Sequence, residues 1–402
     1  MALDQVRVNR LWEAVRLTSH ELVWELDPSG VIRYINDASE ELLGSPPAEL
    51  VGRNVLSLIH PDDVEGAREV LRTCTERRTG WRQVRTRALR ADGRPLWVET
   101  SGVAHVGHED ELLGFTATTR RLDADDARAA QLLITRQRVE EVIREGLLTT
   151  VWQPIFSLYD GAMVGLEALS RFSGAEAQPP DRWFADAFDV GLGHSLETLA
   201  VRSALAIARD FPEHLYLSVN LSPETVATGE LRAVVEQDII PAERIVVELT
   251  EHVSIDNYET VAAGIGILRN AGVRLAVDDA GAGFASFRHI LQLQPDMIKL
   301  DQSITRGITE NPAQRALATA LVLFALEVGS MTVTAEGVET SDDLSTVSSL
   351  GLDAAQGFYM ARPRPASEID WGMAIAPGWP VAAEPPRRPR PRRPASRSAR
   401  PS

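Results

Sequence analysis

The chain has 402 residues, 44% of them hydrophobic, and a formal net charge of −16 at pH 7. That length and apolar content predict two folded domains, because a single ordinary core stops growing before this size. The acidic balance argues against general nucleic-acid binding, whereas acidic side chains gathered in one cleft would suit divalent cations. The sequence has no run of about 18 apolar residues and no signal-peptide stretch at its start, so we expect a cytoplasmic protein without a membrane span.

Two residue types occur once each. Cys74 is the only cysteine, so it can form neither an internal disulfide nor a thiolate metal cluster, and we expect it to fill a core as a small hydrophobe. Lys299 is the only lysine, and the other 40 of the 41 Lys and Arg residues are Arg. A chain that otherwise always uses Arg and keeps one Lys suggests that position 299 needs a compact ammonium.

Residues 1–10 form a short N-terminal segment, after which residues 11–122 alternate strand and turn signals. LVWEL and VIRYIN flank the turn DPSG and predict a β-hairpin. Short amphipathic segments follow between residues 38 and 78, where His60 in IHPDD is expected to cap a helix rather than bind a ligand. WRQVRTRALR, PLWVETSGVAHV and LLGFTATTRRL predict three further strands. This order predicts an α+β domain, a small antiparallel sheet with helices on one face.

The region 11–122 resembles a PAS domain in WELDPSGVIRYIND, ELLGSPPAELVGRN and IHPDD. The resemblance implies a sensor of a ligand, of light or of redox state, or a dimer contact, and it leaves the ligand unknown. A flavin photosensor would need Cys in an Asn-Cys-Arg context, whereas Cys74 lies in LRTCTERR. A haem sensor would need an axial His in the central helix, and residues 64–79 contain no His. We therefore expect neither cofactor.

A polar, helical stretch follows the sensor, with residues 123–137 as a helical linker. Its apolar side chains lie on roughly one face at Leu132, Val139, Val142, Ile143 and Leu147. Simple packing of this face is the first interpretation, and a coiled-coil dimer is the alternative. At the other end, residues 376–402 are rich in Arg and Pro and predict a disordered, solvated tail, with a contact to nucleic acid or acidic lipid as the alternative.

Residues 138–375 are expected to form the second domain, and from residue 151 onward the pattern changes, because short apolar runs now alternate with longer helical segments. The runs are LYLSVN, RIVVEL, VRLAVDD, DMIKLD, MTVTAE and DAAQG. Their polar ends are Asn220, Glu248, Asp278 with Asp279, Lys299, Glu336 and Gln356. Apolar strands between helices predict a parallel sheet covered on its faces, and this many units favour a closed α/β barrel like that of triosephosphate isomerase. Such barrels place their chemistry at the carboxyl ends of the strands, where these polar residues stand.

If the strands close into a ring, five carboxylates and one amide would share its mouth. They are Glu167, Glu248, Asp278, Asp279 and Glu336, with Asn220 as the amide. So much like charge needs cations, and an all-oxygen set suits Mg²⁺ or Mn²⁺ better than zinc. The adjacent Asp278 and Asp279 could bridge two ions, and an ion pair is the usual device for in-line displacement at phosphorus. Lys299 could orient the water and offset charge in the transition state. Taken singly, each residue could instead be a turn, a cap or a solvated carboxylate, but six successive polar ends favour one site.

The segment from about 138 to 370 resembles the EAL domain, the cyclic di-GMP phosphodiesterase family. Glu167-Ala168-Leu169 stands in WQPIFSLYDGAMVGLEALSRF, and SVNLSP, VVELTE, AVDDAGAG, IKLDQSI, TAEGVET and AQGFYMARP follow in order. The metal ligands implied by the resemblance are Glu167, Asn220, Glu248, Asp278, Asp279 and Glu336. The implied catalytic residues are Lys299, Glu336 and Glu167, and the implied substrate contacts are Gln153, Arg171 and Gln356. Glu251 would steady the loop after the paired aspartates, and Asp301 would link that loop to a dimer interface.

One motif departs from the family. The usual Asp-Asp-Phe-Gly-Thr-Gly-Tyr is here Asp278-Asp279-Ala280-Gly281-Ala282-Gly283-Phe284. Losing the aromatic and hydroxyl side chains should loosen the loop without removing a ligand, which affects activity level and dimer coupling rather than the reaction class. The roughly 30 residues between sensor and barrel cannot hold a cyclase domain, so hydrolysis is the only expected output.

The resemblance therefore implies a cyclic di-GMP phosphodiesterase that yields linear pGpG by a two-metal mechanism, with two Mg²⁺ or Mn²⁺ ions, regulation by the PAS domain and a homodimeric state. Three readings of the barrel remain open. It is this enzyme, or a catalytically silent cyclic di-GMP receptor, or a barrel hydrolase for another phosphodiester. The complete ligand set favours the first, and the altered loop is the only support for the second.

Overall fold

The structure is a computed structural model that describes residues 21–173, 178–237, 239–249, 258–281, 284–329 and 331–375. The chain divides into two compact units between Ile134 and Thr135. Among the described residues, no helix is both long enough and apolar enough to cross a bilayer.

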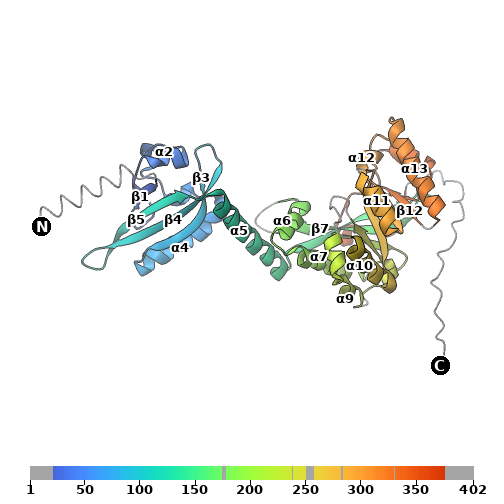
Figure 1. The fold of residues 1–402 in the computed structure, drawn as a ribbon, viewed down its shortest axis with the longest axis horizontal. Coiled ribbons are helices and arrows are strands. Elements are labelled where there is room, and N and C mark those ends of the chain that lie inside the picture. The colour runs from blue at the N-terminus through green and yellow to red at the C-terminus, as the bar shows by residue number, and fades with distance from the viewer. Residues whose placement is uncertain are drawn as a thin grey trace, which may run out of the picture. The chain divides into compact units, whose positions relative to one another are not determined.

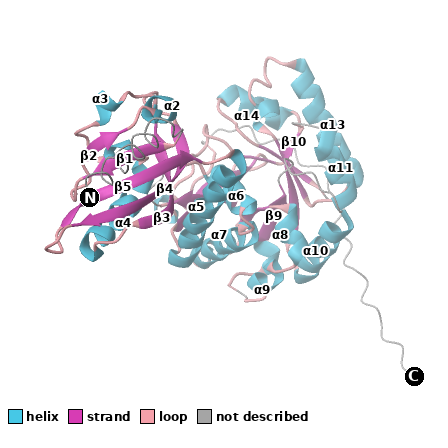
Figure 2. Ribbon diagram, turned by 60° about the vertical axis from the view of Figure 1, so that its left-hand side comes forward, coloured by secondary structure: helices cyan, strands magenta, loops and turns pink. Residues whose placement is uncertain are grey.

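The first unit is built on a five-stranded antiparallel sheet in the order β2-β1-β5-β4-β3. The strands are β1 (Leu22–Leu26), β2 (Ile32–Ile35), β3 (Trp81–Leu89), β4 (Pro95–Val106) and β5 (Leu112–Arg121). The helices are α2 (Ala38–Leu43), α3 (Pro47–Leu50), α4 (Val64–Arg77) and the 3₁₀ turns η1 (Val55–Leu58) and η2 (Pro61–Asp63). Helix α4 lies along one face of the sheet (Figure 2). The predicted α+β architecture is confirmed.

Aromatic side chains pack at the centre of the core of this unit. The ring centroids of Trp24 and Trp81 lie 6.5 Å apart, and those of Trp81 and Phe115 lie 5.4 Å apart. Cys74 is buried in the same cluster, which confirms its prediction as a core hydrophobe. His60 caps η2, because its Nδ1 accepts a hydrogen bond from the backbone N–H of Asp62 at 3.4 Å. The prediction of a capping role is confirmed.

Helix α5 (Ala124–Glu145) follows the sheet. Within the second unit, Val139 and Val142 of α5 are buried in a cluster with Trp183 and Leu196, while Leu132, earlier in the helix, is partly exposed. Arg138 reinforces the packing, because its guanidinium lies 2.5 Å from Asp186 and stacks over the Trp183 ring. The second half of the apolar face therefore serves simple packing against the barrel.

Eight strands form a closed barrel in the second unit, in the order β10-β11-β12-β13-β6-β7-β8-β9. They are β6 (Leu148–Ser157), β7 (Met163–Phe172), β8 (Tyr216–Leu221), β9 (Ile245–Leu249), β10 (Arg274–Ala280), β11 (Met297–Leu300), β12 (Thr332–Ala335) and β13 (Ala354–Ala355). All five residues of β9 and all four of β11 are buried, as expected for strands packed on both sides. The predicted α/β barrel is confirmed.

Strand β6 departs from the predicted parallel arrangement, because it runs antiparallel to both of its neighbours, β7 and β13. Its link to β7 is a tight turn, in which Gly161 takes φ 73° and donates its N–H to the carbonyl of Ser157 at 3.0 Å. A turn this short joins antiparallel strands only, since a parallel pair needs a crossover of a dozen or more residues.

Helices cover the outside of the barrel, among them α10, α11 and α13 in Figure 1. The set is α6 (Pro180–Asp189), α7 (Gly193–Ala208), α8 (Pro223–Thr228), α9 (Leu231–Val235), α10 (Tyr258–Ala271), α11 (Phe284–Leu293), α12 (Gln302–Thr305), α13 (Pro312–Val328) and α14 (Ser341–Ser349), with the 3₁₀ turns η3 (Ala242–Arg244) and η4 (Ala366–Glu368). This arrangement leaves the strand ends free to carry polar side chains.

Candidate active site

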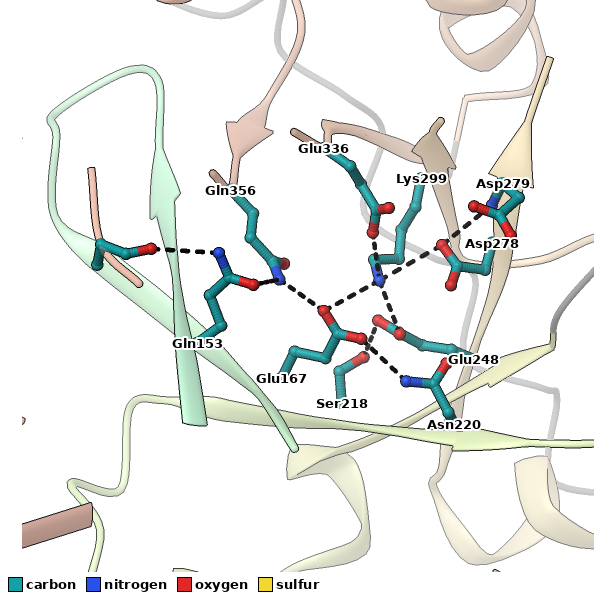
Figure 3. A network of polar contacts seen from close by, with 11 residues as sticks. Gln153, Glu167, Ser218, Asn220, Glu248, Asp278, Asp279, Lys299, Glu336 and Gln356 are labelled. Atoms are coloured by element: carbon teal, nitrogen blue, oxygen red, sulfur yellow. Dashed lines mark hydrogen bonds and ion pairs between the residues drawn. The ribbon is translucent and has the colours of Figure 1, made fainter. Parts of the chain in front are cut away.

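A single ammonium lies at the centre of the barrel mouth. Lys299 on β11 is 2% exposed, and four carboxylates surround its Nζ (Figure 3). The distances from Nζ are 2.5 Å to Glu336, 2.7 Å to Glu248, 3.4 Å to Asp278 and 3.5 Å to Glu167. These acids come from different strand ends, so the closure of the barrel is what brings them to one point.

Two amide side chains donate hydrogen bonds to Glu167 on β7, and a third amide contacts one of these two. Asn220 on β8 donates to Oε1 of Glu167 at 2.9 Å, and Gln356 after β13 donates to Oε2 at 2.5 Å. The same Gln356 amide reaches the Oε1 of Gln153 at 2.9 Å. Gln153 stands directly opposite Glu167 in the antiparallel β6–β7 register, which explains how a residue of β6 enters the site. The Glu167 carboxylate is therefore fixed in orientation.

Ser218 is a site residue that sequence reasoning missed. It is buried on β8, and its hydroxyl donates a short hydrogen bond to Glu248. It stands two positions before Asn220, and side chains two apart on a strand share a face. That alternation was the signal available in the sequence.

An irregularity in β10 lets two neighbouring aspartates reach the mouth. Val277 pairs with Ile298 and Ala280 pairs with Leu300, so Asp278 and Asp279 together oppose Lys299. Successive residues of a regular strand face opposite sides, and an extra residue of this kind re-aims a side chain. Asp279 takes φ 54°, a left-handed conformation that Asp tolerates better than most residues. Its N–H donates to the carboxylate of Asp278 at 3.0 Å, which stabilises the bulge.

Three acids of the mouth could share one cation. Carboxylate oxygens of Asp278, Asp279 and Glu336 all lie within 4.8 Å of one another. Glu167, Glu248 and the Asn220 amide add further oxygen atoms through the contacts already described. No sulfur or imidazole ligand occurs in this set, so its donor chemistry suits a hard divalent cation.

Burial and mutual repulsion shift the pKa values in the cluster. Burial raises the pKa of Glu248 to about 8, with Glu167 and Asp278 adding to the rise and Lys299 opposing it. Burial also raises the pKa of Glu336 well above its ordinary value. Burial alone would lower the pKa of Lys299, but the surrounding carboxylates, Asp278 foremost, raise it well above its ordinary value. Without cations, burial and like charge therefore favour the protonated forms of Glu248 and Glu336, whereas the neighbouring carboxylates keep Lys299 charged.

A family model described as EAL domain matches residues 136–363, which is more than half of the chain. The chain belongs to the EAL-domain family. A second model, described as PAS fold, matches residues 10–122, so the EAL domain follows a PAS domain.

Two curated relatives each match about 60% of this chain. The oxygen sensor protein DosP of Escherichia coli is 30% identical over 259 residues, which cover 61% of this chain and 31% of DosP. The cyclic di-GMP phosphodiesterase NbdA of Pseudomonas aeruginosa is 28% identical over 253 residues, 60% of this chain and 32% of NbdA. The chain thus spans about a third of the length of these curated relatives. The solved FimX EAL domain of Xanthomonas citri, in complex with c-diGMP, matches with TM-score 0.55 at 18% identity over 61% of this chain and 100% of that one, which supports the fold.

An open pocket of about 210 Å³ lies over the Glu167 side of the EAL-domain mouth. Its floor includes Gln153, Glu167, Glu336 and Gln356, which sequence analysis had selected. Its rim includes Gln302, Arg306, Glu339 and Phe358, which it had not. These rim residues stand in loops or short helices after the strands, where no periodic pattern marks them.

Two contacts between side chains are found at the rim of this pocket of the EAL domain. Arg306 lies 2.5 Å from the carboxylate of Glu339. Phe358 is 49% exposed, and the guanidinium of Arg362 lies 4.3 Å from the centre of its ring. The rim therefore offers both charged groups and an accessible aromatic face.

Three expected residues stand outside the central network of the EAL domain. Arg171 is exposed near the end of β7, and its guanidinium donates to the carbonyl of Ser170 at 2.7 Å. Asp301 caps α12 by accepting from the N–H of Ser303 at 2.9 Å. Burial raises its pKa, but hydrogen bonds, foremost those from Ser303, lower it by more. Glu251 lies outside the described residues.

Proposed function

We propose that this protein is a phosphodiesterase that hydrolyses cyclic di-GMP to linear pGpG with the help of two divalent cations. The observation that carries the proposal is the ring of carboxylates around Lys299 at a barrel mouth. Burying one ammonium with four acidic side chains costs desolvation free energy, so this cluster is poorly suited to stabilising the fold alone. A site that binds cations and a phosphodiester would account for this arrangement.

Glu167, Asn220, Glu248, Asp278, Asp279 and Glu336 would hold two Mg²⁺ or Mn²⁺ ions. The fit rests on their all-oxygen donor set and on the clustered oxygens of Asp278, Asp279 and Glu336. When bound, such a pair supplies an activated water and stabilises the leaving oxygen. Cations would offset the burial and the repulsion from neighbouring carboxylates that together raise the pKa of Glu336.

The protein side chains would then divide the remaining work. Lys299 orients the attacking water and offsets charge that develops on the phosphoryl oxygens. Gln356 keeps the Glu167 carboxylate in one orientation through its 2.5 Å hydrogen bond. In the reaction, the water oxygen bonds to phosphorus, the bond from phosphorus to the ribose O3′ breaks, and O3′ takes a proton. The linear product retains a 5′-phosphate.

The outer part of the pocket has chemistry suited to a guanine nucleotide. The face of the Phe358 ring that Arg362 does not cover could stack a base, and such stacking contributes about 1–3 kcal/mol per base. Guanine carries acceptors on one edge and donors on another, which Arg306 and Glu339 complement. Arg171 stands four residues beyond Glu167 on the same strand face, about 13 Å further along the strand. It could reach the distal phosphate of a cyclic dinucleotide.

We further propose that the PAS domain regulates hydrolysis through helix α5. Glu99 is buried on the sheet and binds Arg120 at 2.8 Å and Arg85 at 3.2 Å. Arg85 also lies 3.7 Å from Asp126, in the first turn of α5. This network ties the sheet to the start of the helix, so a change in the sheet has a direct path to α5.

A homodimer is part of the proposal. The resemblance to the EAL-domain family implies it, and Leu291 on α11 and Leu323 on α13, which are 63% and 60% exposed, would be candidate contacts. Light scattering on the purified chain over a range of concentrations tests it, and a monomer at every concentration would exclude it.

The deciding experiment incubates the purified chain with cyclic di-GMP and Mg²⁺ or Mn²⁺ and separates the nucleotides by chromatography, with Lys299→Met as the control. The enzyme predicts linear product from the wild type and none from the variant. Tight binding of cyclic di-GMP without product under either metal would instead support the silent receptor. Hydrolysis of a simple phosphodiester without turnover of cyclic di-GMP would point to another substrate.

A further inference from the structure

Glu197 is a buried carboxylate that the proposed hydrolysis does not use. It stands on α7 and is 7% exposed. Its carboxylate accepts the backbone N–H of Ser222, at 3.0 Å to Oε1 and 3.2 Å to Oε2, and Oε2 also accepts the Ser222 hydroxyl at 2.9 Å. Within the described ranges of the chain, no basic side chain pairs with Glu197. A carboxylate buried without a cation depends on such hydrogen bonds, so its contact with Ser222 is the main interaction to explain.

Ser222 lies at the junction where β8 ends. Asn220 is the last residue but one of β8, and α8 begins directly after Ser222. The pairing of β8 with β7 ends at Val219, whereas its pairing with β9 continues to Leu221. At Asn220 the sheet therefore holds the chain on one side only. Glu197 fixes the backbone directly beyond this point.

Helix α7 carries Glu197 as a firmly packed element. His194, one turn earlier on α7, contacts the Thr225 hydroxyl through Nδ1 at 2.9 Å, and that hydroxyl lies 3.0 Å from Oγ of Ser222. Leu196, beside Glu197, is fully buried in the cluster that α5 shares. Groups carried on a packed helix are placed more precisely than groups on a loop. The carboxylate is thus suited to fix the junction between β8 and α8.

The position of Asn220 affects two side chains of the barrel mouth. Its amide donates to Oε1 of Glu167 at 2.9 Å, and both residues are among the proposed cation ligands. A backbone shift at Asn220 would therefore move one proposed ligand and change the orientation of the other. Loss of a partner that orients metal ligands lowers metal affinity by about 10- to 100-fold in comparable sites.

We propose that Glu197 is a positioning residue for cation binding. It anchors Ser222, and through this anchor it fixes Asn220 and the Glu167 carboxylate that Asn220 contacts. The inference rests on the proposed function, because it takes Asn220 and Glu167 as cation ligands. Glu197 itself touches neither the cations nor the substrate in this proposal.

Glu197→Gln tests the proposal with a nearly isosteric side chain. Both carboxylate oxygens lie within 3.2 Å of the Ser222 nitrogen, so an amide NH₂ at either position would face the backbone N–H, donor against donor. Electron paramagnetic resonance of free Mn²⁺ measures Mn²⁺ binding to the full chain without nucleotide. Burial raises the pKa of Glu197, while hydrogen bonds from Thr225 and Ser222 oppose the rise, so binding is measured at pH 8 to favour the ionised form.

We expect the Mn²⁺ dissociation constant of Glu197→Gln to rise by about tenfold. The Mn²⁺ concentration that gives half-maximal hydrolysis of cyclic di-GMP should rise by the same factor, whereas kcat at saturating Mn²⁺ should stay within about threefold of the wild type. A purely structural role would instead lower the folded fraction, and with it the number of Mn²⁺ sites, without changing their affinity. Urea unfolding without Mn²⁺ checks that the variant is folded.

The matched control is Glu224→Gln, the same exchange at an exposed position of α8. It removes a negative charge near the junction without touching Ser222, and Mn²⁺ binding should stay within about twofold because an exposed charge is screened. Mn²⁺ binding by Glu197→Gln as tight as that of an active wild type would overturn this inference alone. Equal weakening by both variants would also overturn it, since charge rather than position would then be the cause. A wild type that bound no Mn²⁺ would overturn the proposed two-metal function and this inference with it.

Discussion

Replacing Lys299 by Met removes one charge from the centre of the barrel mouth and nearly preserves the length of the side chain. Lys299 is 2% exposed and lies within 3.5 Å of four carboxylates. Removing one partner of a buried ion pair destabilises a protein by about 3–5 kcal/mol, because the other charge stays buried and unpaired. Without divalent ions, we expect the free energy of unfolding of the barrel to fall by about this amount. Mg²⁺ at 100 times its dissociation constant should restore about 2.7 kcal/mol.

The same variant tests the chemistry. Loss of one preorganised charge stabiliser lowers kcat by about 100- to 1,000-fold in comparable sites, and we expect at least this loss of cyclic di-GMP hydrolysis. Urea unfolding followed by circular dichroism, with and without Mg²⁺, measures the first effect, and chromatography of the nucleotides measures the second. Arg136→Met is the control, because Arg136 makes an exposed i,i+4 pair with Glu140 at 2.8 Å, and such pairs contribute little. Hydrolysis by Lys299→Met within about tenfold of the wild type would refute the assignment of the ammonium to the reaction.

Three further changes test separate parts of the molecule. Gln356→Leu removes the 2.5 Å hydrogen bond that orients Glu167, so kcat should fall by about 10- to 100-fold, and an unchanged kcat would show that Glu167 needs no support. Asp27→Asn should destabilise the PAS domain by about 1 kcal/mol at pH 7, because the pKa of Asp27 is lowered to about 2 by hydrogen bonds from Ser29, Val31 and Arg33 that outweigh burial. Because the pKa of Asp27 is lower in the folded state than its unfolded value near 4, its ionised form stabilises the fold above about pH 4, and this stabilisation is lost as the pH falls toward 2. The difference in the free energy of unfolding between wild type and variant, measured with urea, should therefore shrink below about pH 4. A difference that stays constant with pH would contradict the argument. Ala280→Phe restores the residue usual in the family. Because Ala280 is 1% exposed in a packed core, we expect this change to destabilise the barrel by about 1–3 kcal/mol. An unchanged urea midpoint would show that the core has room for the ring.

The sequence predicted the barrel and its polar strand ends because both depend on local pattern. Buried strands read as apolar runs, and the polar residue that closes each run marks the mouth. Asn220, Glu248, Asp278, Lys299 and Gln356 were identified in this way, and the structure brings them together. The role of each in catalysis stays a prediction.

What the sequence could not predict depends on direction, register and loop path. Periodicity gives a strand no orientation, so the antiparallel course of β6 was not foreseen, nor was the pairing that sets Gln153 opposite Glu167. The bulge at Asp279 requires a left-handed backbone that non-glycine residues adopt uncommonly. Arg306 and Phe358 stand in segments without periodic pattern, and only the folded chain brings them to one pocket.

The single lysine of the chain is explained by the geometry around it. Four carboxylates converge on Nζ within 2.5 to 3.5 Å, from four different strand ends. An ammonium is a compact charge with three rotatable donors, whereas a guanidinium is a planar fork that suits one carboxylate in two-point contact. A guanidinium is larger than an ammonium, and it would compete for the room beside the oxygens of Asp278, Asp279 and Glu336, which could share one cation. Several acids, and the ions that they would bind, share one small volume at this point. A compact ammonium fits there better than a guanidinium, which explains why position 299 is Lys in a chain whose other basic residues are Arg.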